Sequence, residues 1–308
     1  MMNTESNYPI GTPGVKWGEA ERAEWLSRQT GKRLYSEEVV VKLEPLKKHF
    51  RMDQYGALSF DSSRYPLFAL KSRRWNSSQR VVLVTGGVHG YETSGVQGAI
   101  RFLQTRAQDY TGRFNLIVAP CVSPWGYETI NRWNPGAVDP NRSFKADTPS
   151  EEAGLLMQYV RGFTNDILVH IDLHETTDTD NTEFRPALAA RDGKKQDNWN
   201  IPDGFYLVGD SQKPVPDFQK AIISSVKKVT HSAPPDENGK INGAELEQWG
   251  VINYEARPLG LCMGMTNANY VTTTEVYPDS PKSDAENCIA AQVAAVVGGL
   301  DYVSKAFK

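Results

Sequence analysis

The segment VTGGVHGYETSG, residues 85–96, holds a histidine and a glutamate three residues apart among glycines. His174 ends one apolar run of the chain, and Glu275 lies near the end of another. A catalytic zinc site needs about three protein ligands, commonly imidazole and carboxylate, and one position open to water. His89, Glu92 and His174 meet that need, and the glycines let the chain reverse tightly enough for the first two to reach one ion. Glu275 could then take a proton from the bound water.

Each of these residues alone also has a structural explanation. A histidine and a glutamate at this spacing are more often a chance pair on the surface than a metal site, and Glu275 could cap the sheet or pair with a lysine. His170 is the rival ligand, four residues before His174 and on the same face of a regular strand, but its mid-strand position favours a structural role. Asp172, between the two histidines, either orients a ligand or simply ends the strand.

The apolar runs before these residues predict strands of a single sheet. Nearly continuous apolar and β-branched runs predict buried strands over residues 80–87, 114–121 and 166–174. Further strands are predicted over residues 65–72, 205–209 and 270–276. Helical spacing predicts helices over residues 17–31, 93–107, 150–163, 218–229 and 288–300.

Strands that alternate with helices predict an α/β domain whose parallel or mixed sheet is covered on both sides. In such sheets ligands bind outside the carboxyl ends of the strands, where the polar residues above lie. Residues 125–144 are predicted to be a long loop, and residues 231–268 match no clear element. No repeat or linker divides the chain, so we expect a single domain over residues 1–308.

Composition argues against several other classes of protein. The net charge of −3 provides no general attraction to nucleic acid or to anionic membranes. No stretch approaches the ~18 apolar residues of a membrane span. The N-terminal residues MMNTESNYPIGTPG lack the apolar segment of a signal peptide, so we expect a cytoplasmic protein. The three cysteines form no CxxC pair, which argues against a thiolate zinc site.

Four segments in one order, GGVHGYE, NRWNPGAVDPNRSF, IDLHETT and TTTEV, resemble the zinc carboxypeptidase family of carboxypeptidase A-like metallopeptidases. The resemblance covers roughly residues 80 to 276. It implies one three-layer α/β/α domain around a twisted, mixed, mostly parallel eight-stranded sheet, with residues 1–60 as an N-terminal extension packed on it. It also implies a single zinc ion held by His89, Glu92 and His174, and Glu275 as the residue that activates the zinc-bound water.

The same resemblance implies a site for the substrate. Asn141 and Arg142 of DPNRSF match a pair that binds a terminal carboxylate, a task for which the planar guanidinium is suited because it can donate two hydrogen bonds. Arg132 matches an arginine that polarises the scissile carbonyl and stabilises the oxyanion. Pro140 stands where the family often has an apolar residue such as leucine.

Two features of the substrate site are left open by the resemblance. Tyr254 is our choice for the tyrosine that closes over the substrate, with Tyr270 and Tyr277 as competitors. Arg185 and the stretch 251–268 are candidates to line the specificity pocket.

The resemblance extends to two substrate classes. DLHETT is at least as similar to the acylase branch, aspartoacylase and succinylglutamate desuccinylase, as to secreted carboxypeptidases, and the arginine spacing is similar to that of murein peptide amidase. Acylases usually carry an extra C-terminal β-domain, whereas the residues after Glu275 are predicted to be helical. We therefore expect a metallocarboxypeptidase or amidase that cleaves a small peptide next to a free carboxylate, with an N-acyl amino acid deacylase as the alternative. A non-catalytic binding module would have no need of Glu275.

Overall fold

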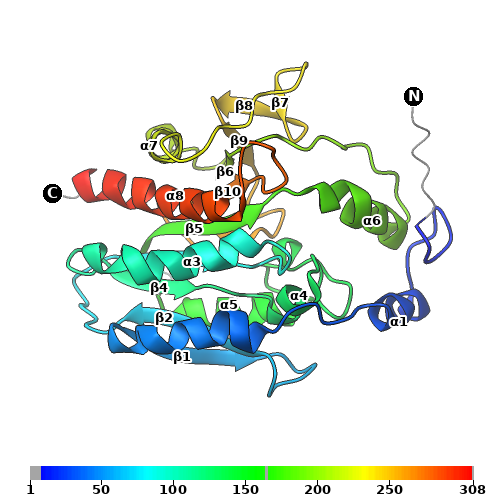
Figure 1. Cartoon of the computed structure of the whole chain (residues 1–308), viewed down its shortest axis with the longest axis horizontal. Coiled ribbons are helices and arrows are strands. Elements are labelled where there is room, and N and C mark those ends of the chain that lie inside the picture. Colours follow the sequence, from blue (N-terminus) through cyan, green and yellow to red (C-terminus); the bar gives the residue numbers. More distant parts are fainter. Residues whose placement is uncertain (1–7, 164–165, 307–308) are drawn as a thin grey trace.

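A mixed sheet runs through the centre of the molecule, and the computed structural model describes residues 8–163 and 166–306 (Figure 1). Among these residues, ten strands follow the order β1-β2-β4-β3-β5-β10-β6-β9-β8-β7. The strands are β1 Phe50–Ala57, β2 Pro66–Ser72, β3 Val81–Gly86, β4 Asn115–Ala119, β5 Ile167–Glu175, β6 Tyr206–Asp210, β7 Lys240–Ile241, β8 Ala244–Gln248, β9 Val251–Tyr254 and β10 Tyr270–Val276. β4, β3, β5 and β10 are parallel neighbours. Their carboxyl ends therefore meet at one edge of the sheet.

Helices cover both faces of this sheet. They are α1 Glu19–Ser27, α2 Val41–Leu43, α3 Thr93–Thr105, α4 Pro124–Thr129, α5 Glu151–Val160, α6 Arg185–Asp192, α7 Pro216–Val226 and α8 Ala285–Ala306. Val82 and Val84 of β3 belong to the core formed with α3, α7 and α8. Val81 and Leu83 belong to the core on the opposite face, formed with α5. Because successive side chains of a strand point to opposite faces, a continuous apolar run is what a strand buried on both sides requires.

The α/β class and the mixed sheet are confirmed, but the described sheet has ten strands and not eight. β7, β8 and β9 arise from residues 231–268, to which we assigned no element. These strands are short, and β8 is half-exposed or exposed along its length, so it carries no apolar pattern. The parallel arrangement holds at the centre, whereas β2 and β6 join it through antiparallel pairs. α4 and a 3₁₀ turn at Pro140–Arg142 also interrupt the predicted loop at 125–144.

The segment before the sheet packs on the loop at 125–144 through tryptophan rings. The Trp25 ring lies 5.5 Å from that of Trp133 and 6.0 Å from that of Trp125, centre to centre. Arg33 donates hydrogen bonds to the carbonyl oxygens of Tyr127 and Gly90 and stacks on the Tyr127 ring. These contacts fix the loop against the turn that carries His89.

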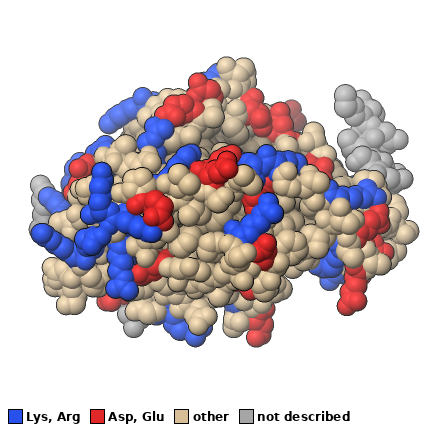
Figure 2. Space-filling model, turned by 60° about the horizontal axis from the view of Figure 1, so that its bottom comes forward, with Lys and Arg blue, Asp and Glu red and all other residues tan. Residues whose placement is uncertain are grey.

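Charges of both signs are spread over the surface. Figure 2 shows positive and negative side chains interspersed on one face of the molecule, as the nearly balanced composition predicts. Within residues 8–163 and 166–306, no helix combines the length and the apolar character that a membrane crossing requires.

Candidate active site

The turn between β3 and α3 brings His89 and Glu92 together. Gly87 has a φ of 60°, which lies in the left-handed region that glycine adopts without strain. Gly90 is needed for a different reason: a Cβ there would lie 2.0 Å from backbone atoms of Gly126 and Tyr127. The turn is thus pressed directly against α4, and its glycines permit both the reversal of the chain and this close backbone contact.

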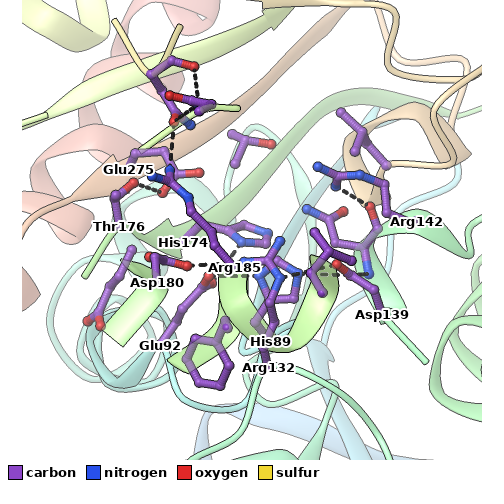
Figure 3. Close-up of a pocket in the computed structure, with 18 of the residues that line it drawn as sticks. His89, Glu92, Arg132, Asp139, Arg142, His174, Thr176, Asp180, Arg185 and Glu275 are labelled. Atoms are coloured by element: carbon purple, nitrogen blue, oxygen red, sulfur yellow. Dashed lines mark hydrogen bonds and ion pairs between the residues drawn. The ribbon is translucent and has the colours of Figure 1, made fainter. Parts of the chain in front are cut away.

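Three buried side chains converge at the carboxyl edge of the sheet (Figure 3). One candidate ligand atom each from His89, Glu92 and His174 lies within 4.8 Å of the others. Nδ1 of His89 is 2.7 Å from one carboxylate oxygen of Glu92, and Nδ1 of His174 is 2.7 Å from the other. Burial alone would raise the pKa of Glu92, but electrostatic interactions and hydrogen bonds with His174 and His89 lower it to about 2. Two imidazoles and one carboxylate form a donor set suited to a divalent metal ion.

Both histidines are held from behind by a second carboxylate. Nε2 of His89 is 3.1 Å from Oδ1 of Asp139, and Nε2 of His174 is 2.7 Å from Oδ2 of Asp172. A carboxylate at this position fixes the proton on Nε2 and leaves Nδ1 free to bind a metal. The residues present therefore fit a metal ion. Asp172 makes the contact with Nε2 of His174 that the first of its two predicted alternatives requires.

Asp139 is the residue of this cluster that we did not predict. It belongs to the segment DPNRSF, but we assigned roles only to Asn141 and Arg142 there. Burial would raise the pKa of Asp139, whereas the charge of Arg132 and the contact with His89 hold it well below its usual range. The carboxylate thereby links a candidate metal ligand to the candidate oxyanion-binding arginine.

His170, the rival ligand, lies outside the converging group. Its Nε2 is 3.1 Å from the hydroxyl of Thr85, which itself donates to Oδ1 of Asp172. Burial lowers the pKa of His170 to about 4, so the ring is neutral at physiological pH. Its contacts are those of a structural histidine in the core.

Glu275 is paired in register with His174 across the parallel strands β10 and β5. Its carboxylate lines the cavity and accepts a hydrogen bond of 3.1 Å from the hydroxyl of Thr176. Burial raises the pKa of Glu275 to about 8, and the negative charges of Glu92 and Asp180 act in the same direction. The geometry places a carboxyl group of raised pKa beside the candidate metal ligands.

Gln292 of α8 ties together the elements that carry these groups. Its side-chain amide donates to the carbonyl oxygen of His174 at 2.8 Å, and its amide oxygen accepts from Thr274, the neighbour of Glu275. The same amide nitrogen lies 3.5 Å from the hydroxyl of Ser94, at the start of α3 beside Glu92. One buried side chain therefore bridges β5, β10 and α3.

Arg132 is held by acidic and phenolic partners. Its Nε donates to Oδ2 of Asp139 at 3.1 Å, and Nη1 donates to the hydroxyl of Tyr91 at 3.3 Å. Asp180 lies 3.6 Å from the same Nη1. The guanidinium is fixed close to His89, through Asp139, and lines the cavity.

Asn141 and Arg142 lie on the 3₁₀ turn that follows Asp139. The Asn141 amide oxygen accepts from the backbone N–H of Cys262 at 2.8 Å, and its amide nitrogen has no protein partner among the described residues. Arg142 is exposed and donates to the Asn141 carbonyl oxygen at 2.7 Å. Across residues 8–163 and 166–306, no carboxylate forms an ion pair with Arg142.

Of the three candidate tyrosines, Tyr254 is the one that lines the cavity. It ends β9 and is half-buried. The Tyr270 ring packs against Phe218, and the Tyr277 hydroxyl donates to Asp178. Tyr254 and Arg142 line the same cavity, and the charge of Arg142 opposes the rise that burial causes in the pKa of Tyr254.

The predicted residues surround one cavity of about 530 Å³. Its wall includes all eight predicted site residues: His89, Glu92, Arg132, Asn141, Arg142, His174, Tyr254 and Glu275. Further polar residues that we did not assign, among them Asp180 and Asn242, complete the wall together with Arg185. The size suits a small ligand.

Residues 78–201 match the family model of the succinylglutamate desuccinylase/aspartoacylase catalytic domain. The matched range contains His89, Glu92 and His174, whereas Tyr254 and Glu275 lie beyond it. A search of curated protein sequences finds no significant match.

Solved structures provide a second comparison. A protein of Shewanella amazonensis that is assigned to the metallopeptidases has a TM-score of 0.64 and 18% identity over 87% of this chain and 91% of that chain. A metallo-carboxypeptidase from Burkholderia cenocepacia has a TM-score of 0.59 and 15% identity over 86% and 68% of the two chains. Bovine thrombin-activatable fibrinolysis inhibitor, in complex with tick carboxypeptidase inhibitor, has a TM-score of 0.56 and 13% identity over 95% and 98%. At these identities the likeness is one of fold.

Proposed function

We propose that the chain is a hydrolase of the zinc carboxypeptidase-like group, related to the aspartoacylase branch, and that it cleaves an amide bond next to a free carboxylate. His89, Glu92 and His174 would hold one zinc ion. The observation that carries the proposal is that both imidazoles turn Nδ1 toward Glu92 while a carboxylate holds each Nε2. When bound there, zinc supplies a Lewis acid that polarises a carbonyl and lowers the pKa of water.

Glu275 acts as the general base and then as the general acid. Its carboxylate takes a proton from the attacking water and later delivers a proton to the leaving amine. The hydrogen bond from Thr176 fixes one carboxylate oxygen, which leaves the other free for proton transfer. A base whose orientation is already fixed does not have to be reorganised during the reaction.

The substrate is held by the opposite part of the cavity. Asn141 and Arg142 bind the free carboxylate, because one offers an amide N–H and the other an unpaired guanidinium. Arg132 stabilises the negative charge that develops on the scissile carbonyl oxygen. Tyr254 covers the bound substrate from the end of β9.

We place a small peptide first among the substrates and an N-acyl amino acid second. The second candidate is favoured by the match of residues 78–201 to the desuccinylase and aspartoacylase domain. Both substrates present an amide beside a free carboxylate, so the same residues act on either.

Metal content and hydrolysis together test the proposal. We expect about one zinc per chain after purification without chelators, and a large loss of zinc from His89→Ala. His49→Ala is the matched control, because His49 is exposed and lies outside the cavity. Zinc-loaded protein is then assayed on C-terminal peptides, murein-type peptides and N-acyl amino acids. A wild-type protein without stoichiometric metal, or one that cleaves none of these amides when loaded, would overturn the proposal.

A further inference from the structure

Arg185 presents a positive charge to the cavity without a negative partner. It begins α6, is half-buried and lines the cavity wall. Its Nη1 donates to the side-chain oxygen of Asn181 at 2.7 Å and to the carbonyl oxygen of Asn200 at 3.0 Å. Its Nη2 donates to the side-chain oxygen of Asn242 at 3.0 Å. Among the described residues these acceptors are all neutral, and Nε–H and one Nη2–H have no partner.

Two other arginines of the same cavity are neutralised by carboxylates. Arg132 is bound to Asp139 and lies near Asp180. Arg191 forms two hydrogen bonds with Asp192, of 2.9 and 3.2 Å, and lies over the Trp133 ring. A partly desolvated cation held only by neutral oxygens is costly unless another group supplies the negative charge. The charge of Asp180 acts on Arg185 without forming an ion pair with it, so a directly bound negative group has to come from a ligand.

The position of Arg185 relative to Glu275 and Arg142 indicates which part of the substrate it would contact. Asn242, its partner, donates to the Tyr206 hydroxyl at 3.4 Å, and that hydroxyl shares a hydrogen bond of 2.8 Å with Thr176, the partner of Glu275. Arg185 is therefore anchored to the side of the site that carries Glu275.

Arg142 belongs to the other side of the site, since it follows Asp139, the partner of His89. Figure 3 shows Arg142 beyond His89 and Asp139, away from Glu275 and Thr176. If the free carboxylate of the substrate is held at Arg142 and the scissile amide lies at the metal ligands, a group that reaches Arg185 lies beyond the amide. It belongs to the acyl half of the substrate.

We propose that Arg185 forms a subsite for a carboxylate in the acyl half of the substrate, so that the enzyme prefers peptides whose penultimate residue is Asp or Glu. This inference rests on the proposed function. The guanidinium suits the task because its remaining N–H groups can bind a carboxylate with charge-assisted hydrogen bonds. Selectivity then depends on two carboxylates of the substrate: the terminal carboxylate binds Arg142, and the side-chain carboxylate of the penultimate residue binds Arg185.

The test compares blocked peptides that differ only in a penultimate Glu or Gln. We expect zinc-loaded wild-type protein to have a kcat/KM about 10- to 100-fold higher for the Glu peptide, the range of a charge-assisted hydrogen bond. In Arg185→Gln the ratio falls to about one. Arg191→Gln is the matched control, a paired arginine of the same wall, and it keeps the wild-type ratio. Equal ratios in wild type and Arg185→Gln would overturn the proposal.

Two further measurements separate a subsite from a structural role. Arg185→Glu should invert the preference, so that a penultimate Lys peptide is cleaved faster than the Glu peptide, while Arg185→Lys should keep part of the preference for Glu. Binding of the Glu and Gln peptides to metal-loaded Glu275→Gln, with and without Arg185→Gln, gives the same comparison without turnover. Cleavage of no amide refutes the proposed function, whereas cleavage or binding with a Glu-to-Gln ratio of one refutes the subsite alone.

Discussion

The two walls of the cavity are built differently. On one wall, His89, Glu92 and His174 are nearly inaccessible to solvent, and carboxylates contact both ring nitrogens of each histidine. The other wall comprises the substrate-binding residues from both sides of the site: Arg142 is exposed, and Arg185 and Tyr254 are half-buried. The first wall is organised before any substrate arrives, as catalysis by fixed charges requires. On the second wall neither Arg142 nor Arg185 forms an ion pair with a described carboxylate, and in our proposal the substrate supplies the negative charge.

The largest expected effect is on the organised wall. Glu275→Gln should lower kcat by about 10²- to 10⁴-fold, because the amide cannot take the proton of water. Zinc content should stay at the wild-type level, since Glu275 is not a ligand. Both are measured on the same preparation by steady-state kinetics and elemental analysis. Glu245→Gln, on the exposed strand β8, serves as the control, and near-normal turnover by Glu275→Gln would remove Glu275 from the mechanism.

The next largest effect is expected on zinc affinity when Asp172, the carboxylate that contacts Nε2 of His174, is replaced. Asp172→Asn should weaken zinc binding by roughly 10- to 100-fold, because the new amide N–H faces Nε2 and favours the tautomer whose proton sits on Nδ1. Titration with a competing chelator measures the affinity. Asp203→Asn is the control, since it removes the carboxylate partner of His231 away from the cavity. Equal affinities in wild type and Asp172→Asn would mean that the contact is dispensable.

A smaller effect is expected on the unpaired wall. Arg142→Gln should raise KM by about tenfold with little change in kcat, the signature of an interaction that binds ground state and transition state alike. The effect should vanish for a substrate whose terminal carboxylate is replaced by a carboxamide. If wild type and Arg142→Gln differ equally on both substrates, the carboxylate is bound elsewhere.

The smallest expected effect is a difference in folding stability between variants of Tyr206 and Tyr254. Tyr206 shares a hydrogen bond with Thr176, whereas the Tyr254 hydroxyl has no partner within the described ranges. Tyr206→Phe should lower the free energy of unfolding by about 1 kcal/mol, and Tyr254→Phe should leave it within about 0.5 kcal/mol of wild type. Denaturant titration measures both values. Equal losses of stability would show that Tyr254 is structural.

The organised wall is also the part that could be predicted from the sequence. His89, Glu92 and His174 follow buried strands whose apolar runs are continuous, and parallel strands bring their carboxyl ends to one edge. Asp139 could not be assigned by the same argument, because its contact with His89 joins residues fifty positions apart in the sequence. No local pattern encodes such a contact.

The unpaired wall depends on segments with weak sequence patterns. β7, β8 and β9 are short, and β8 alternates between half-exposed and exposed residues, so hydrophobic periodicity does not reveal it. Tyr254 lines the cavity because β9 pairs in parallel with β6, which spacing alone does not show. Asn181 lies in the helical turn directly before Arg185, but Asn200 and Asn242 come from separate loops, and their contact with Arg185 is a property of the fold.

Gln292 has a consequence for the order in which the site is made. A ribosome that has reached Glu275 has already produced both histidines, all three glutamates and every arginine of the cavity. It has not yet produced the side chain that bridges β5, β10 and the start of α3. The completed site therefore arises late in biosynthesis, after α8 has been translated and has docked, and a nascent chain that stops short of this helix carries the reactive groups without the bridge that fixes them.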